Sequence, residues 1–291
     1  MSRIAEAVSH GAITIVNAMA TGKGAALGIS LQTRATITVT DQPGVFVARN
    51  LSDPDEDTAL ARAAAKQVFE RLGAHKRHGA IIQTDSNIPI AVGLKSSSAA
   101  SDAITLASVY ALGRRLSDLE VIKLGVQASF KAGVTLTGAF DDACACYFGG
   151  VVITNNVRRR ILKRLRPRGR FRVLIHVPRI KRYTRDVDPG SFGSIRSFAL
   201  AAYRTALRGN YWSSMTLNGM AYSMALGYDT KLAISALDSG AIAAGLSGKG
   251  PAVAAIVPET KHDNVRAAWR RIEGHVIEAS FNSKKALARK L

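Results

Sequence analysis

Cysteine is scarce in this chain. Among 291 residues there are only two, Cys144 and Cys146, with a single alanine between them. Such close neighbours do not tie distant elements together, and the six histidines are too scattered to complete a zinc site beside them. A disulfide-rich secreted domain is therefore excluded. The pattern is typical of a reduced intracellular protein, and we expect a cytoplasmic location.

Long hydrophobic runs and acidic residues are also in short supply. Even the uncharged segment 210–228 is rich in Ser, Asn, Thr and Gly, so no transmembrane span is expected. Asp and Glu number 21 against 40 Lys and Arg, which gives a formal net charge of +19. A positive field of this kind attracts anions. Nucleotides, phosphorylated or carboxylated metabolites and nucleic acids all fit it, and the charge alone does not choose among them.

What the chain does contain is an ordinary globular share of hydrophobic residues, 47%, arranged in alternating helical and strand-like segments. The Gly-rich stretch ATGKGAALG, residues 20–28, is expected to be a loop. A boundary is expected just before a basic run, so that residues 1–155 and 156–291 form two lobes. Strands are expected at residues 12–18, 33–40, 80–84, 151–154, 171–177, 252–257 and 274–279, and helices at residues 54–72, 96–112, 117–132, 194–208, 211–226, 231–239 and 263–273.

The strongest local signal is PIAVGLKSSSAASDA, residues 89–103, where a glycine turn meets a run of serines at the start of an Ala-rich helix. The first N–H groups of a helix have no intrahelical partners, and the helix dipole adds about half a positive charge there. Gly93 lets the backbone approach an anion, and Lys95 adds a mobile positive charge. The segment predicts a phosphate site, although serines in this position equally suit plain helix capping.

A Walker A loop is absent. That motif requires GxxxxGK followed by Ser or Thr. Here Gly22-Lys23 and Gly248-Lys249 are each followed by Gly. The P-loop class of nucleotide-binding proteins is thereby excluded.

PIAVGLKSSSAA resembles the Pro-x-x-x-Gly-Leu-x-Ser-Ser-Ala phosphate loop of the GHMP kinases. Two departures, Lys95 in place of the usual Gly and one additional serine, resemble the archaeal shikimate kinase branch of that family. Further similarity lies in GAITIVNAMATGKGAALGI near the start and TGAFDDA in the middle. GLSGKGPAVAAI, residues 245–256, is similar to the family's third motif, a glycine loop that folds back toward the nucleotide phosphates.

The resemblance implies an α+β fold in two lobes with the active site between them. The N-terminal lobe would hold a mixed sheet with a left-handed βαβ crossover, and the C-terminal lobe would be ferredoxin-like. It also implies an ATP-dependent kinase that uses Mg²⁺ and converts shikimate to shikimate 3-phosphate, in the biosynthesis of chorismate and aromatic amino acids. The nucleotide-binding residues implied are Pro89, Gly93, Leu94, Lys95, Ser96, Ser97, Ser98, Ala99, Gly248 and Gly250.

Asp141 and Asp142 are the expected catalytic carboxylates, because the family places an Asp shortly before a Gly pair, here Gly149-Gly150. Counting back from that pair favours Asp142, and counting forward from the preceding glycine favours Asp141, so both stay candidates. Either could accept the proton of the substrate hydroxyl. The upstream Glu with which many members hold Mg²⁺ is missing. We therefore expect the two aspartates to divide the work, with Ser98 and Asp141 as the metal ligands.

Lys23, inside ATGKGAALG, is similar in place to the family's substrate-side motif. A lysine there could pair with a substrate carboxylate or neutralise charge in the transition state, and we expect a catalytic role. The plain alternative is an exposed loop lysine.

The basic run, residues 158–172, holds nine Lys or Arg. Clustered cations bind nucleic-acid phosphates, but Phe171 is the one aromatic residue in the run and no nucleic-acid motif accompanies it. We interpret the run as a solvated hairpin or connector, and the basic cluster at residues 179–185 is equally ambiguous. The rival functions are another GHMP kinase, such as homoserine kinase, and a basic nucleic-acid-binding protein.

Overall fold

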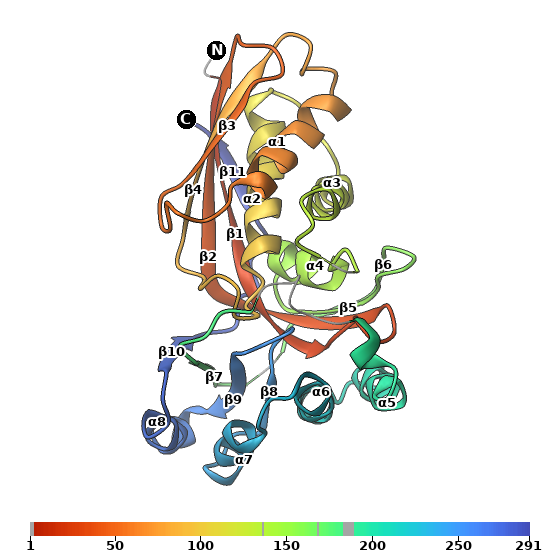
Figure 1. Ribbon diagram of the computed structural model, residues 1–291, viewed down its shortest axis with the longest axis vertical. Coiled ribbons are helices and arrows are strands. Elements are labelled where there is room, and N and C mark those ends of the chain that lie inside the picture. The colour runs from red at the N-terminus through yellow and green to blue at the C-terminus, as the bar shows by residue number, and fades with distance from the viewer. Residues whose placement is uncertain (1–2, 136, 168, 183–188) are drawn as a thin grey trace.

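Two β-sheets form the frame of the molecule, one in each lobe (Figure 1). The structure, a computed structural model, describes residues 3–135, 137–167, 169–182 and 189–291. The first sheet has seven strands in the order β11-β1-β2-β4-β3, with β5 pairing with β2 and β6 with β5. Its strands are β1 (Ile4–Val16), β2 (Lys23–Thr40), β3 (Phe46–Asn50), β4 (Gly79–Ser86), β5 (Val151–Asn155), β6 (Arg160–Leu165) and β11 (Leu287–Lys290).

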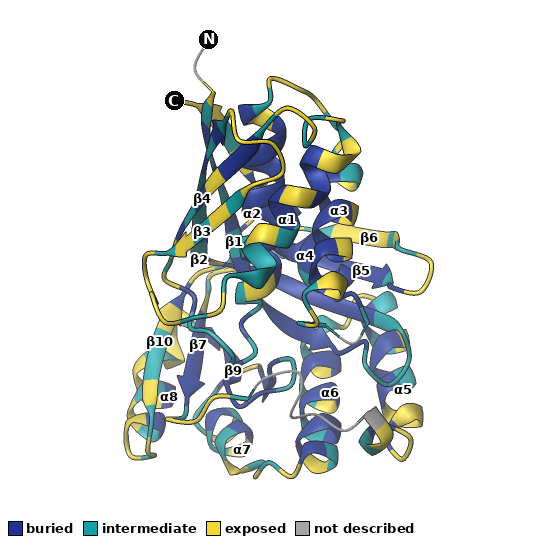
Figure 2. Cartoon of the chain, turned by 45° about the horizontal axis from the view of Figure 1, so that its top comes forward, coloured by how far each residue is buried: buried dark blue, intermediate teal, exposed yellow. Residues whose placement is uncertain are grey.

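Helices cover one face of this sheet, and alternate side chains along β1 and β2 are buried beneath them (Figure 2). The strands β3 and β4 are parallel, and α1 connects them as a βαβ crossover. Ser117 and Glu120 form a capping box at the start of α3. The helices are α1 (Ala59–Arg71), α2 (Ser96–Ala111), α3 (Asp118–Lys131) and α4 (Phe140–Phe148).

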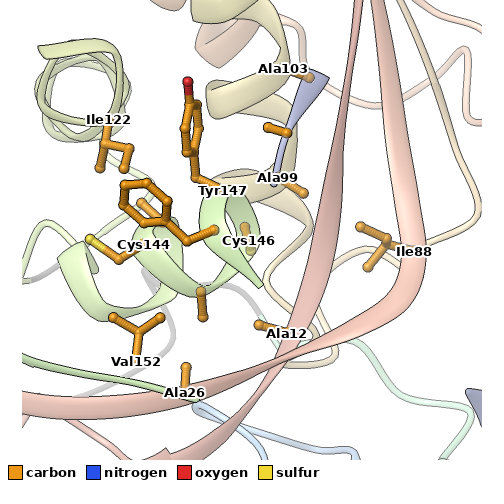
Figure 3. Packing of buried hydrophobic residues seen from close by; sticks show 14 of the residues in the cluster. Ala12, Ala26, Ile88, Ala99, Ala103, Ile122, Cys144, Cys146, Tyr147 and Val152 are labelled. Atoms are coloured by element: carbon orange, nitrogen blue, oxygen red, sulfur yellow. The ribbon is translucent and has the colours of Figure 1, made fainter. Parts of the chain in front are cut away.

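Small side chains let α2 and α4 lie close to the sheet (Figure 3). Ala12 and Ala26 on the strands face Ala99 on α2 and the buried, free Cys144 and Cys146 on α4. The abundance of alanine in the sequence is thus used where helices must approach strands closely. This close approach fixes the starts of α2 and α4 relative to each other.

The second lobe is ferredoxin-like, as the resemblance implied. Its antiparallel strands follow the order β10-β7-β9-β8, and the chain order is the β-α-β-β-α-β pattern of that fold with three helices, α5 to α7, in place of the first one. The elements are β7 (Phe171–Val177), α5 (Arg196–Leu207), α6 (Tyr211–Leu226), α7 (Lys231–Asp238), β8 (Ala243–Leu246), β9 (Val253–Pro258), α8 (His262–Arg270) and β10 (His275–Ala279), with short 3₁₀ turns at Pro189–Phe192 and Glu259–Lys261. Within the described residues, no helix combines the length and apolarity needed to cross a bilayer.

The pairing of the strands differs from the predicted division into residues 1–155 and 156–291. The basic run begins with β6, which pairs with β5 and extends the first sheet to Leu165. At the other end, β11 returns to the same sheet beside β1. The chain therefore leaves the first lobe after β6 and comes back to it after β10.

The described part of the basic run forms an exposed hairpin strand and its connection to β7, as interpreted from the sequence. The guanidinium of Arg164 lies 3.7 Å from the centre of the Phe148 ring, the Lys163 ammonium donates to the Leu207 carbonyl, and Arg172 pairs with Glu259. Charged side chains on an edge strand discourage pairing with other chains. Arg168 in this run and residues 183–185 of the second basic cluster lie outside the described residues.

Three local expectations need correction. The stretch expected as a loop at residues 20–28 is already strand β2 from Lys23 onward, because Lys23–Leu27 pairs with β5. The helix expected from residue 54 begins at Ala59, where the Asp57 carboxylate accepts a hydrogen bond from the first helical N–H. Helix α4, which carries both aspartates, was not expected.

Helix α6 lies so close to β8 that a Cβ atom on Gly219 would stand 2.4 Å from the Cα of Gly245. We expect Gly219→Ala to lower the free energy of unfolding by roughly 1–3 kcal/mol, because backbone would have to move. Leu217→Ala, on the more exposed side of the same helix, should change it by less than about 0.5 kcal/mol. Urea unfolding measures both, and equal effects would contradict the close approach.

Candidate active site

A cavity opens where the lobes meet. Its lining comes from the end of β1, the segment that leads into α2, the start of α4 and the loop after β8. Three of the sequence motifs, which are far apart along the chain, therefore border one space.

The start of α2 presents the serines to this cavity. Ser96, Ser97 and Ser98 line it, while Lys95 is the N-cap residue and no side chain caps the first turn. The serines therefore do not cap the helix, which was the alternative that the sequence allowed. The backbone N–H groups of this turn and the serine hydroxyls form an anion-binding array.

The glycine loop after β8 lies against the segment before α2, with backbone touching backbone. A Cβ atom on Gly93 would stand 2.0 Å from the carbonyl oxygen of Ser247, and Gly93 has φ +94°. The Ser247 hydroxyl donates to the Gly93 carbonyl over 2.8 Å, and the Ala252 N–H donates to the Val92 carbonyl over 3.1 Å. Glycine is required at position 93 for both steric and conformational reasons.

Asp141 lies in the first turn of α4 and is almost completely buried. Its carboxylate accepts a 2.6 Å hydrogen bond from the Asn156 amide, and it fills the space above Gly24, where a Cβ atom would stand 2.1 Å from Oδ2. Burial, reinforced by the Asp142 carboxylate, raises the pKa of Asp141 to about 7. The hydrogen bond from Asn156 and the charge of Lys95 act in the opposite direction.

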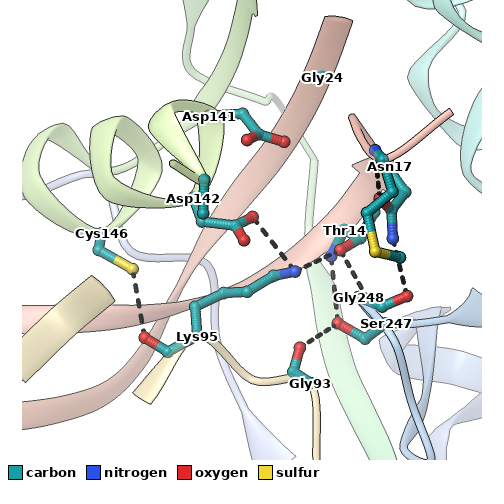
Figure 4. A network of polar contacts seen from close by, with 12 residues as sticks. Thr14, Asn17, Gly24, Gly93, Lys95, Asp141, Asp142, Cys146, Ser247 and Gly248 are labelled. Atoms are coloured by element: carbon teal, nitrogen blue, oxygen red, sulfur yellow. Dashed lines mark hydrogen bonds and ion pairs between the residues drawn. The ribbon is translucent and has the colours of Figure 1, made fainter. Parts of the chain in front are cut away.

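Asp142 points toward the start of α2 instead (Figure 4). Its Oδ1 lies 3.1 Å from the ammonium of Lys95, whose side chain is only 6% exposed. Lys95 was expected to be a mobile charge, and this expectation is wrong, because the ion pair and the burial fix it. The adjacent aspartates therefore face different motifs. Asp141 faces the start of β2, and Asp142 faces the segment before α2.

The other predicted residues divide into those at the cavity and those behind it. Gly248 lines the cavity, whereas Leu94 and Ala99 are buried in the core and Gly250 lies against Tyr228. Pro89 borders a second, neighbouring hollow. Lys23 adjoins Gly24, and its ammonium lies 5.8 Å from the centre of the Tyr203 ring. Asp141 lies over Gly24, the next residue in the chain, so Lys23 is near Asp141 by its place in the sequence.

Sequence reasoning missed three polar residues here. Asn156 both donates to Asp141 and accepts from its backbone N–H, and it is itself fixed by the Thr154 hydroxyl. Thr14 accepts the Gly248 N–H, and the Asn17 side chain donates to the Gly248 carbonyl. Single polar residues at strand ends carry no motif, so the one available signal was their position next to a turn.

Strained backbone gathers around the cavity. Of the four non-glycine residues with positive φ among those described, Ala91, Lys95 and Ala139 all line it. L-residues avoid this conformation, and it persists where the surroundings enforce it, often at functional sites.

Comparison with known proteins adds independent findings. Residues 59–150 match the GHMP kinases N terminal domain, and residues 214–275 match the GHMP kinases C terminal domain. A shikimate kinase of Methanosarcina mazei is 42% identical over 97% of this chain and 96% of its own length. A shikimate kinase of Pyrococcus abyssi is 41% identical over 93% of this chain and 96% of its own length.

Solved structures of low identity share the fold. A homoserine kinase from Cytophaga hutchinsonii has a TM-score of 0.77 at 16% identity, covering 99% of this chain and 98% of that one. The Methanococcus jannaschii mevalonate kinase has a TM-score of 0.75 at 16% identity, covering 97% and 99%.

The raised pKa of Asp141 predicts a stability cost at this position. Between the ordinary carboxyl pKa and about pH 7 the folded state holds a proton that the unfolded state releases, so stability falls as pH rises through this window. Asp141→Asn should therefore unfold at a higher temperature than the wild type at about pH 8, and this gain should vanish at about pH 4.

Thermal unfolding of both proteins at the two pH values measures this difference. The control is Asp238→Asn on the exposed face of α7, which should give no such pH-dependent gain. A gain for Asp141→Asn that is the same at both pH values would contradict the assignment.

Proposed function

The chain belongs to the GHMP kinase family, and from this premise we propose that it is a shikimate kinase. In the reaction, the 3-hydroxyl of shikimate attacks the γ-phosphorus of ATP, and shikimate 3-phosphate and ADP are formed. The observation that carries the proposal is the identity of 36–42% with curated shikimate kinases over nearly the whole chain, joined to a cavity where the family's three motifs meet. We place the reaction in the cytoplasm, in the biosynthesis of chorismate and aromatic amino acids.

The nucleotide phosphates would lie at the start of α2. Ser96, Ser97 and Ser98 offer hydroxyls and backbone N–H groups there, and Gly248 allows close approach from the opposite side. Charge stabilisation of this kind supplies most of the catalysis in phosphoryl transfer.

The adenine would occupy the neighbouring hollow that Pro89 borders. Its apolar wall includes Ile88 and Val92, and Asn50 and Asp53 lie at its polar edge. The side-chain oxygen Oδ1 of Asn50 accepts from the backbone N–H groups of Ser52 and Asp53, which leaves the side-chain NH₂ group as a donor for a base.

Asp141 is the proposed proton acceptor. It lies over Gly24 on β2, and a pKa near 7 suits a group that takes a proton at neutral pH. Lys23, beside it, would attract the shikimate carboxylate.

Mg²⁺ would neutralise phosphate charge when bound with the nucleotide. In the described part of the chain, no group of three or more His, Cys, Asp or Glu side chains is arranged so that it could hold a metal ion by itself. Mg²⁺ bound to ATP needs only one or two protein oxygens, because phosphates and water complete its shell. Ser98 and the aspartate pair fit this requirement. The sequence favoured Asp141 for the metal, whereas the geometry favours Asp142, which faces the phosphate segment.

A coupled assay of ADP formation with shikimate, homoserine and mevalonate tests the substrate. We expect shikimate to be preferred, and a clear preference for homoserine or mevalonate would overturn the substrate while sparing the fold. ATP with Mg²⁺ at about 100 times its dissociation constant should stabilise the protein by about 2.7 kcal/mol. Salt-sensitive retention on RNA without stabilisation by nucleotide would favour the nucleic-acid rival.

Asp141→Asn should lower kcat by roughly 100- to 10,000-fold, because the hydroxyl loses its proton acceptor. Asp142→Asn should also lower kcat and should raise the Mg²⁺ concentration needed for half-maximal rate. The exposed Asp238→Asn serves as the control for both. Near-normal turnover in both active-site variants would eliminate the proposed division of labour.

A further inference from the structure

Lys95 occupies a backbone conformation that glycine would adopt more easily. Its φ is +67° and its ψ is 28°, in the left-handed region, at the residue just before α2. A lysine in this place carries a strain that glycine would not. Such a conformation persists where surrounding contacts hold it, and the Lys95 side chain makes contacts of this kind.

The side chain of Lys95 joins the segment before α2 to β1 and α4, and Thr14 extends this link to the glycine loop. Its ammonium donates to the Thr14 hydroxyl at the end of β1 over 2.6 Å and lies 3.1 Å from Oδ1 of Asp142 on α4 (Figure 4). The same Thr14 oxygen accepts the Gly248 N–H over 2.8 Å. A Cβ atom on Gly248 would stand 3.0 Å from the ammonium nitrogen, so the glycine loop is shaped around it.

This arrangement controls where Asp142 can point. Asp141 and Asp142 are adjacent carboxylates that repel each other, and both border the cavity. The buried ammonium attracts Asp142 toward the start of α2, while Asn156 holds Asp141 against Gly24. Because the Lys95 side chain is only 6% exposed and has two fixed partners, it cannot swing into solvent and release the carboxylate.

We propose that Lys95 is a positioning residue for phosphoryl transfer, which acts by holding Asp142 at the phosphate end of the cavity and apart from Asp141. The proposal rests on the proposed kinase function. It gives Lys95 a role through another side chain, different from that of a cation that simply binds the nucleotide phosphates.

A double-mutant cycle separates these two roles. Lys95→Met keeps the length of the side chain and the backbone strain but removes the charge. We expect kcat to fall by roughly 100-fold, as for a misplaced catalytic group, while the KM for ATP changes by less than about threefold. The double variant Lys95→Met with Asp142→Asn should have a kcat within about threefold of Asp142→Asn alone.

Two outcomes would overturn the proposal. In one, the kcat losses of the single variants multiply in the double variant, which means that Lys95 acts independently of Asp142. In the other, Lys95→Met raises the KM for ATP strongly and leaves kcat unchanged, which is the signature of uniform phosphate binding. Lys66→Met removes the same charge from an exposed site on α1 and should leave both constants unchanged.

Two control experiments separate this proposal from a failure to fold and from a wrong substrate. If Lys95→Met does not unfold cooperatively, the same cycle is run with Lys95→Gly, which removes the ammonium and relieves the positive φ. The wild type is assayed with shikimate in parallel. If it forms no ADP with shikimate, the proposed substrate fails, and the cycle is completed with whichever alcohol the wild type phosphorylates, so the two failures are read independently.

Discussion

The contact between the backbones of Gly93 and Ser247 is the constraint on which the site depends. The two lobes meet there with no room for a side chain between them. Because one backbone belongs to the segment before α2 and the other to the loop after β8, this contact sets the walls of the cavity from both sheets at once.

The cavity concentrates features that a folding chain otherwise avoids. A carboxylate is buried at Asp141, an ammonium is buried at Lys95, and non-glycine residues adopt positive φ at Ala91 and Ala139. Each costs free energy, and the surrounding helices and sheets, with their Ala-rich interfaces, offset it. Several local conflicts with the rules of stability therefore lie together where the motifs meet, although others lie elsewhere, such as the buried Asp102 on α2 and the positive φ of Arg159.

The sequence predicted much of the second lobe and the start of α2 after the glycine turn, because α6 has clear bounds, β7 contains β-branched residues and the serine run marks a helix start. It did not predict β11, which is four residues long and has no periodic pattern. Spacing alone did not separate Asp141 from Asp142, since only the folded structure shows that one lies over Gly24 and the other beside Lys95. The fixed position of Lys95 was hidden for a similar reason, because its left-handed backbone turns the side chain inward.

The pairing of β11 with β1 has a consequence for the order in which the protein acquires its structure. Ala5 pairs with Lys290, and the two ends of the described chain lie side by side (Figure 1). During synthesis β1 leaves the ribosome first, yet one of its edges stays open until the entire ferredoxin-like lobe has been translated. Pairings so distant in sequence slow folding and expose unpaired strands. The sheet that supports the proposed phosphate site consequently keeps an unpaired edge while the chain is still growing.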